Sequence, residues 1–185
     1  MKNKWMIVSS VLLCGLMLLG LFGCNQEPVS GGTTDKTDYN APKVIKSKEI
    51  TKFYATFYPA GEWLGGDESM QYVFEVKKDA EGKLTASESK TGISVPADKT
   101  MLKSLQDIID KYKLVKNNGV YRVTAGLAPE CQECSMNVSY ASGEELSFTA
   151  NNDPYAEWEK EMYMTFASWF SKNGDKILVP PQNKE

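Results

Sequence analysis

Cys131 and Cys134 form the one motif in this chain whose residue types and spacing suit thiol chemistry. In an exported protein this spacing permits a small disulfide loop or a redox-active pair. A thioredoxin-type pair lies at a helix N-terminus, where the helix dipole stabilises a thiolate. Residues 135–138 instead predict a strand, and Glu130 and Glu133 add negative charge, which disfavours a thiolate. We therefore expect a structural disulfide between Cys131 and Cys134, with reduced thiols without a role or a redox pair as alternatives.

Histidine is absent from the sequence. This excludes Ser-His-Asp and Cys-His nucleophile systems and the common histidine-containing zinc sites. A zinc site at Cys131 and Cys134 would need two further ligands, and no second closely spaced cysteine pair exists. Phosphate-binding glycine loops are also absent. We therefore assign no catalytic residue, no metal site and no cofactor.

Trp63 and Arg122 are the candidate ligand contacts. Trp63 lies in the glycine-containing loop 62–67, where an exposed aromatic side chain can anchor a ligand or a partner. The alternative is that Trp63 folds back over one end of the core. Arg122 is the only arginine and can clamp an anion, or it can form an ion pair with one of the many acidic residues.

The strands that must position these residues are predicted from the alternation of apolar and polar side chains. This pattern predicts strands at 50–58, 70–77, 83–89, 120–123, 136–140 and 145–150. Short turns between most of them indicate hairpins. Such an order favours an antiparallel sheet.

Two helices are expected between and after these strands. Asp98 is suited to cap a helix of about fifteen residues. Asp153 is expected to cap the second helix, with Pro154 at its first position. The second helix carries an apolar stripe that we place in the core: Tyr155, Trp158, Met162, Phe166 and Trp169. The predicted fold class is α+β, an antiparallel sheet with two amphipathic helices packed on one face.

The N-terminal 24 residues resemble the signal segment of a bacterial lipoprotein. Lys2 and Lys4 precede an apolar run over 5–22, and the run ends in the lipobox-like sequence Leu21-Phe22-Gly23-Cys24. The run is slightly shorter than the roughly 20 residues of a membrane-spanning helix, and its end fits an ordinary signal cleavage site poorly. An uncleaved anchor and plain secretion are the alternatives. The resemblance implies removal of residues 1–23 and attachment of lipid to Cys24.

The remainder of the chain divides into three segments. Residues 24–45 are polar and rich in glycine and proline, which predicts a flexible tether. Residues 46–181 are long enough for a single α+β domain, and 182–185 form a tail. The chain carries a net charge of −3, which becomes −5 when Lys2 and Lys4 are removed with residues 1–23. This charge and the single arginine argue against nucleic-acid binding.

Residues 126–148, GLAPECQECSMNVSYASGEELSF, resemble uncharacterised domains in lipoproteins of Gram-positive anaerobes. The resemblance brings no known activity. We expect a lipid-anchored protein on the extracytoplasmic face of the cell membrane that acts as a non-catalytic binding module for an envelope protein or a small-molecule ligand. The alternatives are an enzyme, as a carboxylate-based hydrolase or a thiol-disulfide protein, and a purely structural envelope component.

Overall fold

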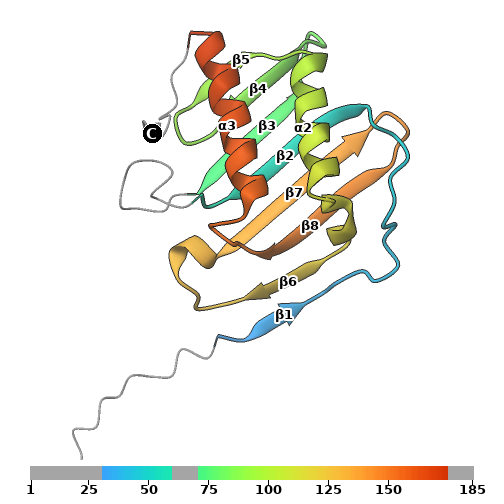
Figure 1. Cartoon of the computed structure of the whole chain (residues 1–185), viewed down its shortest axis with the longest axis vertical. Helices are drawn as coiled ribbons and strands as arrows, with labels where there is room; N and C mark the ends of the chain where they lie inside the picture. Colours follow the sequence, from blue (N-terminus) through green and yellow to red (C-terminus); the bar gives the residue numbers. More distant parts are fainter. Residues whose placement is uncertain (1–30, 60–70, 175–185) are drawn as a thin grey trace, which may run out of the picture. The chain divides into compact units, whose positions relative to one another are not determined.

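A computed structural model describes residues 31–59 and 71–174. In this part of the chain, eight strands form one sheet in the order β1-β6-β8-β7-β2-β3-β4-β5 (Figure 1). The strands are β1 (Thr33–Asp35), β2 (Ile50–Phe57), β3 (Tyr72–Lys78), β4 (Leu84–Glu88), β5 (Ile93–Pro96), β6 (Tyr121–Thr124), β7 (Glu133–Tyr140) and β8 (Glu145–Asn151). The α-helices are α2 (Lys99–Lys111) and α3 (Glu157–Lys172), and the 3-10 helices are η2 (Leu114–Asn117) and η3 (Pro129–Cys131).

The predicted α+β class is confirmed, but the sheet is mixed rather than purely antiparallel. Six of its seven strand pairs are antiparallel, and β6 pairs with β8 in the parallel direction. The chain reaches β6 from α2 through η2 rather than through a hairpin. A connection of this length can return to the sheet in either direction, so the turn signals could not determine it.

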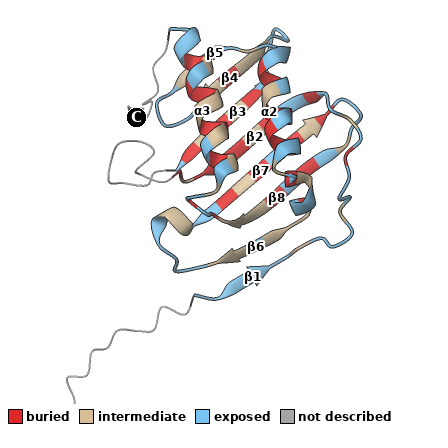
Figure 2. Cartoon of the chain, in the orientation of Figure 1, coloured by how far each residue is buried: buried red, intermediate tan, exposed pale blue. Residues whose placement is uncertain are grey.

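The core forms where alternate strand residues meet the helices. Phe53 of β2 and Phe74 of β3 are fully buried and contact Phe166 of α3, with ring centroids 6.0 Å and 4.4 Å from it. Both helices lie in front of the sheet in Figure 1, and α2 contacts both α3 and β2. Figure 2 shows buried residues along β2, β3, β7 and β8, whereas β1 is exposed throughout.

Of the two predicted helix starts, the structure confirms the first and contradicts the second. Asp98 caps α2 as predicted, and its Oδ1 accepts hydrogen bonds from the backbone N–H groups of Thr100 and Met101. The predicted start of the second helix at Asp153 is wrong, because α3 begins at Glu157. The Asp153 carboxylate instead accepts a hydrogen bond from Tyr155 N. This local side-chain-to-backbone bond forms a non-helical turn where the first turn of the helix was expected.

The apolar stripe of α3 is correspondingly shorter than expected. Met162 and Phe166 are buried, whereas Trp158 and Trp169 are only partly buried and pack against the core. Tyr155 precedes the helix and is 64% exposed. The buried face also includes Tyr163 and Phe170, which follow the same helical periodicity.

The expectation of a flexible tether over 24–45 is wrong for residues 31–45. Strand β1 pairs with β6 along Thr33–Asp35. Beyond it, Lys36 N donates to Tyr121 O and Asp38 N donates to Gly119 O, each at 2.8 Å. Ile45 is 6% exposed and belongs to the hydrophobic core. The folded domain therefore includes residues before 46.

Asn118 and Gly119 hold this N-terminal segment against the domain. Asn118 Nδ2 donates to Pro42 O at 2.9 Å, and Lys43 Nζ donates to Asn118 O. Gly119 has a φ of +79°, and a Cβ on it would lie 2.3 Å from Ala41 Cβ. Only glycine allows this close approach without a shift in the neighbouring chain. Residues 24–30 and the expected tail at 182–185 lie outside the described residues.

Candidate functional site

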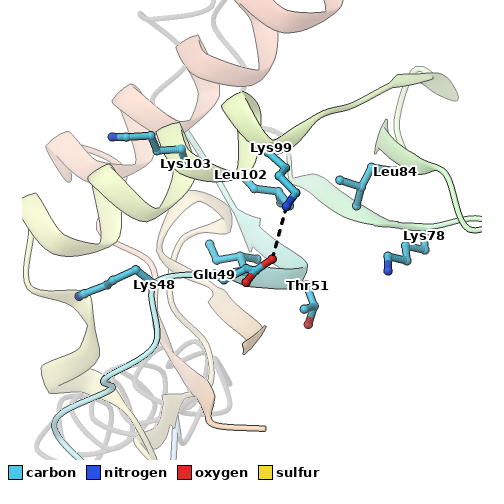
Figure 3. A pocket seen from close by; sticks show the side chains of 9 residues that line it. Lys48, Glu49, Thr51, Lys78, Leu84, Lys99, Leu102 and Lys103 are labelled. Atoms are coloured by element: carbon cyan, nitrogen blue, oxygen red, sulfur yellow. Dashed lines mark ion pairs between the residues drawn. The ribbon is translucent and has the colours of Figure 1, made fainter. Parts of the chain in front are cut away.

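A cavity of about 540 Å³ lies where β2 begins, β3 ends and β4 begins, beside the first turns of α2 (Figure 3). Its lining comes from four separate parts of the chain, which the sheet register and the capped start of α2 bring together. The lining residues are Lys48, Glu49, Ile50, Thr51, Lys78, Leu84, Lys99, Leu102 and Lys103.

The floor of the cavity is apolar. Ile50 at the start of β2 is 3% exposed, and Leu102 in the first turn of α2 is 7% exposed. Leu84 at the start of β4 is partly buried and packs against the same core. These three side chains join the cavity to the rigid interior, so its base is preformed.

Four lysines surround this floor, and two of them form close ion pairs. Lys48 Nζ lies 2.6 Å from Asp110 Oδ1, and Lys103 Nζ lies 2.6 Å from Asp107 Oδ2. Figure 3 shows both of these amines directed away from Glu49. Their charges are therefore already balanced outside the cavity.

Lys78 and Lys99 are the amines available to a ligand. Lys99 Nζ is directed toward Glu49 and lies 3.8 Å from Glu49 Oε1 (Figure 3). Lys78, at the end of β3, has no ion pair within the described ranges 31–59 and 71–174. The cavity thus concentrates positive charge on a protein whose net charge is negative, an arrangement that attracts anions.

Arg122, one of the two candidate contacts, lies far from this cavity. It is on β6, which β8 and β7 separate from β2. Its Nε lies 3.8 Å from Asp35 Oδ2, which is the ion pair considered as the alternative for this residue. Hydrogen bonds from Thr37 lower the pKa of Asp35, and the Arg122 charge adds to this effect. Trp63, the other candidate contact, lies outside the described residues.

Cys131 and Cys134 are both free thiols in the structure, so the expected disulfide is not present there. Cys134 lies on β7 and is 3% exposed. Burial raises the pKa of its thiol to about 12, and the nearby charge of Glu159 acts in the same direction. A thiol with so high a pKa is a poor nucleophile at neutral pH, which disfavours the redox alternative.

Glu159 is the titratable residue that sequence reasoning missed. It is fully buried in the first turn of α3, and neither carboxylate oxygen has a hydrogen-bond partner in the described part of the chain. Burial raises the pKa of its carboxyl to about 9, and the charge of Asp153 adds a smaller rise, while the nearby Asn152 side chain lowers the pKa slightly. The helical spacing from Met162 to Phe166 places residue 159 on the buried face, which is the signal that could have identified it.

A second hollow of about 330 Å³ lies between α2 and α3, with Trp169, Glu161 and Lys172 in its lining. Glu161 is already bonded to Lys111 and Tyr112, and Trp169 Nε1 donates to Pro96 O. Because the polar groups of Glu161 and Trp169 already have partners within the domain, the lysine cavity is the stronger candidate site.

The described ranges contain neither a metal-binding cluster nor a membrane-spanning helix. No group of three or more acidic, cysteine or histidine side chains there could hold a metal ion. No described helix is long and apolar enough to cross a membrane. No protein-family model, curated protein or solved structure matches this chain.

Proposed function

We propose that this protein is an extracytoplasmic lipoprotein, anchored to the cell membrane through lipid on Cys24, whose domain binds a ligand without chemically changing it. The observation that carries the proposal is the lysine cavity. It combines a preformed apolar floor with two amines, Lys78 and Lys99, that have no close ion pair. Small-molecule sites commonly have this composition, a mostly apolar surface with a few placed polar groups.

The chemistry of the cavity supports binding rather than hydrolysis. Glu49 is the one carboxylate among its described lining residues, whereas glycoside hydrolysis normally uses two. Four described groups have strongly raised pKa values, and none of them lines the lysine cavity or the hollow between α2 and α3: Cys134, Tyr140, Glu159 and Tyr163. A substrate in the lysine cavity would therefore meet charges suited to recognition and no matched acid–base pair.

The anchor in this proposal holds the domain close to the membrane. Two acyl chains on Cys24 would give stable attachment where one chain is marginal. Because β1 begins at Thr33, the segment between Cys24 and the sheet is shorter than the expected tether over 24–45. Eight residues lie between Cys24 and Thr33, and a chain of this length spans at most about 30 Å.

Two measurements on the full chain test the proposal. Immunoblotting of membrane and soluble fractions should show wild type of mature size in the membrane fraction and Cys24→Ser only as an unprocessed precursor. A Cys24→Ser protein of mature size that is soluble without detergent would contradict the anchor. In parallel, the thermal unfolding of the wild type should shift upward with a low-molecular-mass fraction of cell-envelope extract. The doubly substituted variant Lys78→Gln/Lys99→Gln should lose that shift. A wild type that responds to no fraction would contradict the binding function.

A further inference from the structure

We infer that the lysine cavity takes an amphiphilic anion, a molecule with one phosphate or carboxylate group on an aliphatic chain. This inference rests on the proposed binding function and narrows it to a ligand class. It follows from the charges available, the composition of the floor and the groups that are absent from the lining.

The charges favour a small anionic head group. Lys78 on β3 and Lys99 on α2 both line the cavity, so a head group bound between these two elements would lie near both lysine side chains. Lys99 would exchange a 3.8 Å contact with the exposed Glu49 for a shorter one with the ligand. Charge-assisted hydrogen bonds from an amine to phosphate or carboxylate are stronger than neutral ones.

The floor favours an aliphatic chain. Ile50, Leu84 and Leu102 present branched alkyl groups, and the stems of the lysines extend this apolar surface. Each methylene of a ligand buried here should tighten binding by about fourfold. A cavity of about 540 Å³ is within the usual range for small ligands.

The lining disfavours the other common ligand classes. Among the residues that the structure describes, the lining has no aromatic side chain on which a nucleobase or a sugar ring could stack. Its single hydroxyl, on Thr51, already donates to Ser139 O at 3.1 Å. One carboxylate is too few for a calcium site. An aliphatic anion would use the apolar floor and the amines of Lys78 and Lys99.

We favour a freely dissolved amphiphile, rather than a lipid within a bilayer, as the molecule that carries the bound anionic head group. After loss of residues 1–23 the chain carries a net charge of −5. An anionic bilayer surface repels such a protein as a whole, whereas a single small anion is affected mainly by the nearby lysines. Binding to the bilayer is therefore an outcome that the experiment must separate.

Calorimetric titration of the lipidated full chain in phosphatidylcholine nanodiscs tests this inference, with empty nanodiscs as the blank. The probes are hexyl phosphate, inorganic phosphate and hexanol. We expect hexyl phosphate to bind at least about tenfold more tightly than either fragment, because only it engages both the amines and the floor. Equal affinity for hexyl phosphate and inorganic phosphate would overturn the inference.

Variants assign the binding to the cavity. The double variant Lys78→Gln/Lys99→Gln should weaken hexyl phosphate binding by about tenfold. The matched control is Lys172→Gln, which removes an exposed lysine at the end of α3 and should leave the affinity unchanged. Circular dichroism checks that both proteins are folded. Equal weakening by the control would mean nonspecific charge attraction and would overturn the inference.

Two further outcomes separate the possible failures. Protection of the cavity residues from hydrogen exchange in nanodiscs containing phosphatidylglycerol, without hexyl phosphate binding, would identify a bilayer head group and overturn the inference. A thermal shift by envelope extract without hexyl phosphate binding would overturn the ligand class and leave the binding function standing.

Discussion

Lys99 Nζ and Glu49 Oε1 lie 3.8 Å apart beside the apolar floor of the cavity, and both side chains are largely exposed. Exposed ion pairs of this kind contribute little to folding, about 0–1 kcal/mol. The small stabilising energy of this ion pair matters for binding, because an anionic ligand can replace Glu49 beside Lys99 at little cost in free energy. Glu49 is thus a competitor for the amine that the ligand would use.

Replacing Glu49 with Gln should therefore tighten binding of hexyl phosphate. The substitution removes both the competing carboxylate and its repulsion of the incoming anion, which together are worth about two- to fivefold in affinity. Calorimetric titration measures the change. The control is Glu133→Gln, which alters an exposed acid at the start of β7. The cavity lies near the opposite end of that strand, where Tyr140 pairs with Ile50. Unchanged affinity in Glu49→Gln would show that Glu49 does not compete with the ligand for Lys99.

Glu159 should make stability fall as pH rises. Its pKa is raised from 4.5 in the unfolded chain to about 9 in the fold, so the folded protein keeps a proton that the unfolded chain releases. The cost is absent below pH 4.5 and grows by up to about 1.4 kcal/mol per pH unit towards pH 9. Urea unfolding at a series of pH values should show this slope in the wild type.

Glu159→Gln should reduce that slope, because an amide does not ionise in this range. The buried amide also needs hydrogen-bond partners, so the pH dependence is the informative quantity rather than the stability at one pH. Glu157→Gln, an exposed change on the same helix, should keep the wild-type slope. An unaltered slope in Glu159→Gln would mean that another group causes it.

Asn118→Ala should destabilise the domain by about 2–4 kcal/mol. Its amide donates to Pro42 O and Glu145 O, and its carbonyl accepts from Ser147 N at 2.8 Å. Because the contact with Pro42 holds the N-terminal segment, amide hydrogen exchange at residues 36–38 should also become faster. Asn117→Ala, the exposed neighbour, should change neither quantity.

The two thiols should differ in reactivity. Iodoacetamide at pH 8 should label Cys131 in the native protein and Cys134 only after unfolding, because Cys134 is buried and its pKa is about 12. Fragment mass spectrometry of the shared tryptic peptide locates each label. If neither cysteine reacts in denaturant without a reductant, the pair is a disulfide after all.

Much of the fold could be predicted because its signals are local. Alternation located β2, β3 and the β7–β8 hairpin, and the Asp98 cap marked the start of α2. The missed strands, β1 and β5, have three and four residues and no strong alternation. They form because neighbouring strands offer unpaired backbone groups. The sequence of a short segment does not show that such a neighbour exists.

The candidate site could not be predicted in the same way. Lys78 and Lys99 are ordinary surface residues in the sequence, and only strand pairing and the capped helix bring them beside Ile50. The residues singled out for their chemistry had other surroundings: Arg122 pairs with Asp35, and Cys134 is enclosed in the core.

The sequence by itself determined the α+β class, the absence of histidine chemistry and the net negative charge, since these depend on composition and short-range periodicity. The tertiary structure alone decided that 31–45 belongs to the domain, that Glu159 is buried without a hydrogen-bond partner among the described residues, and that Lys78 and Lys99 line a cavity with an apolar floor. Each of these depends on which distant segments meet, and burial and local charge exist only once they do.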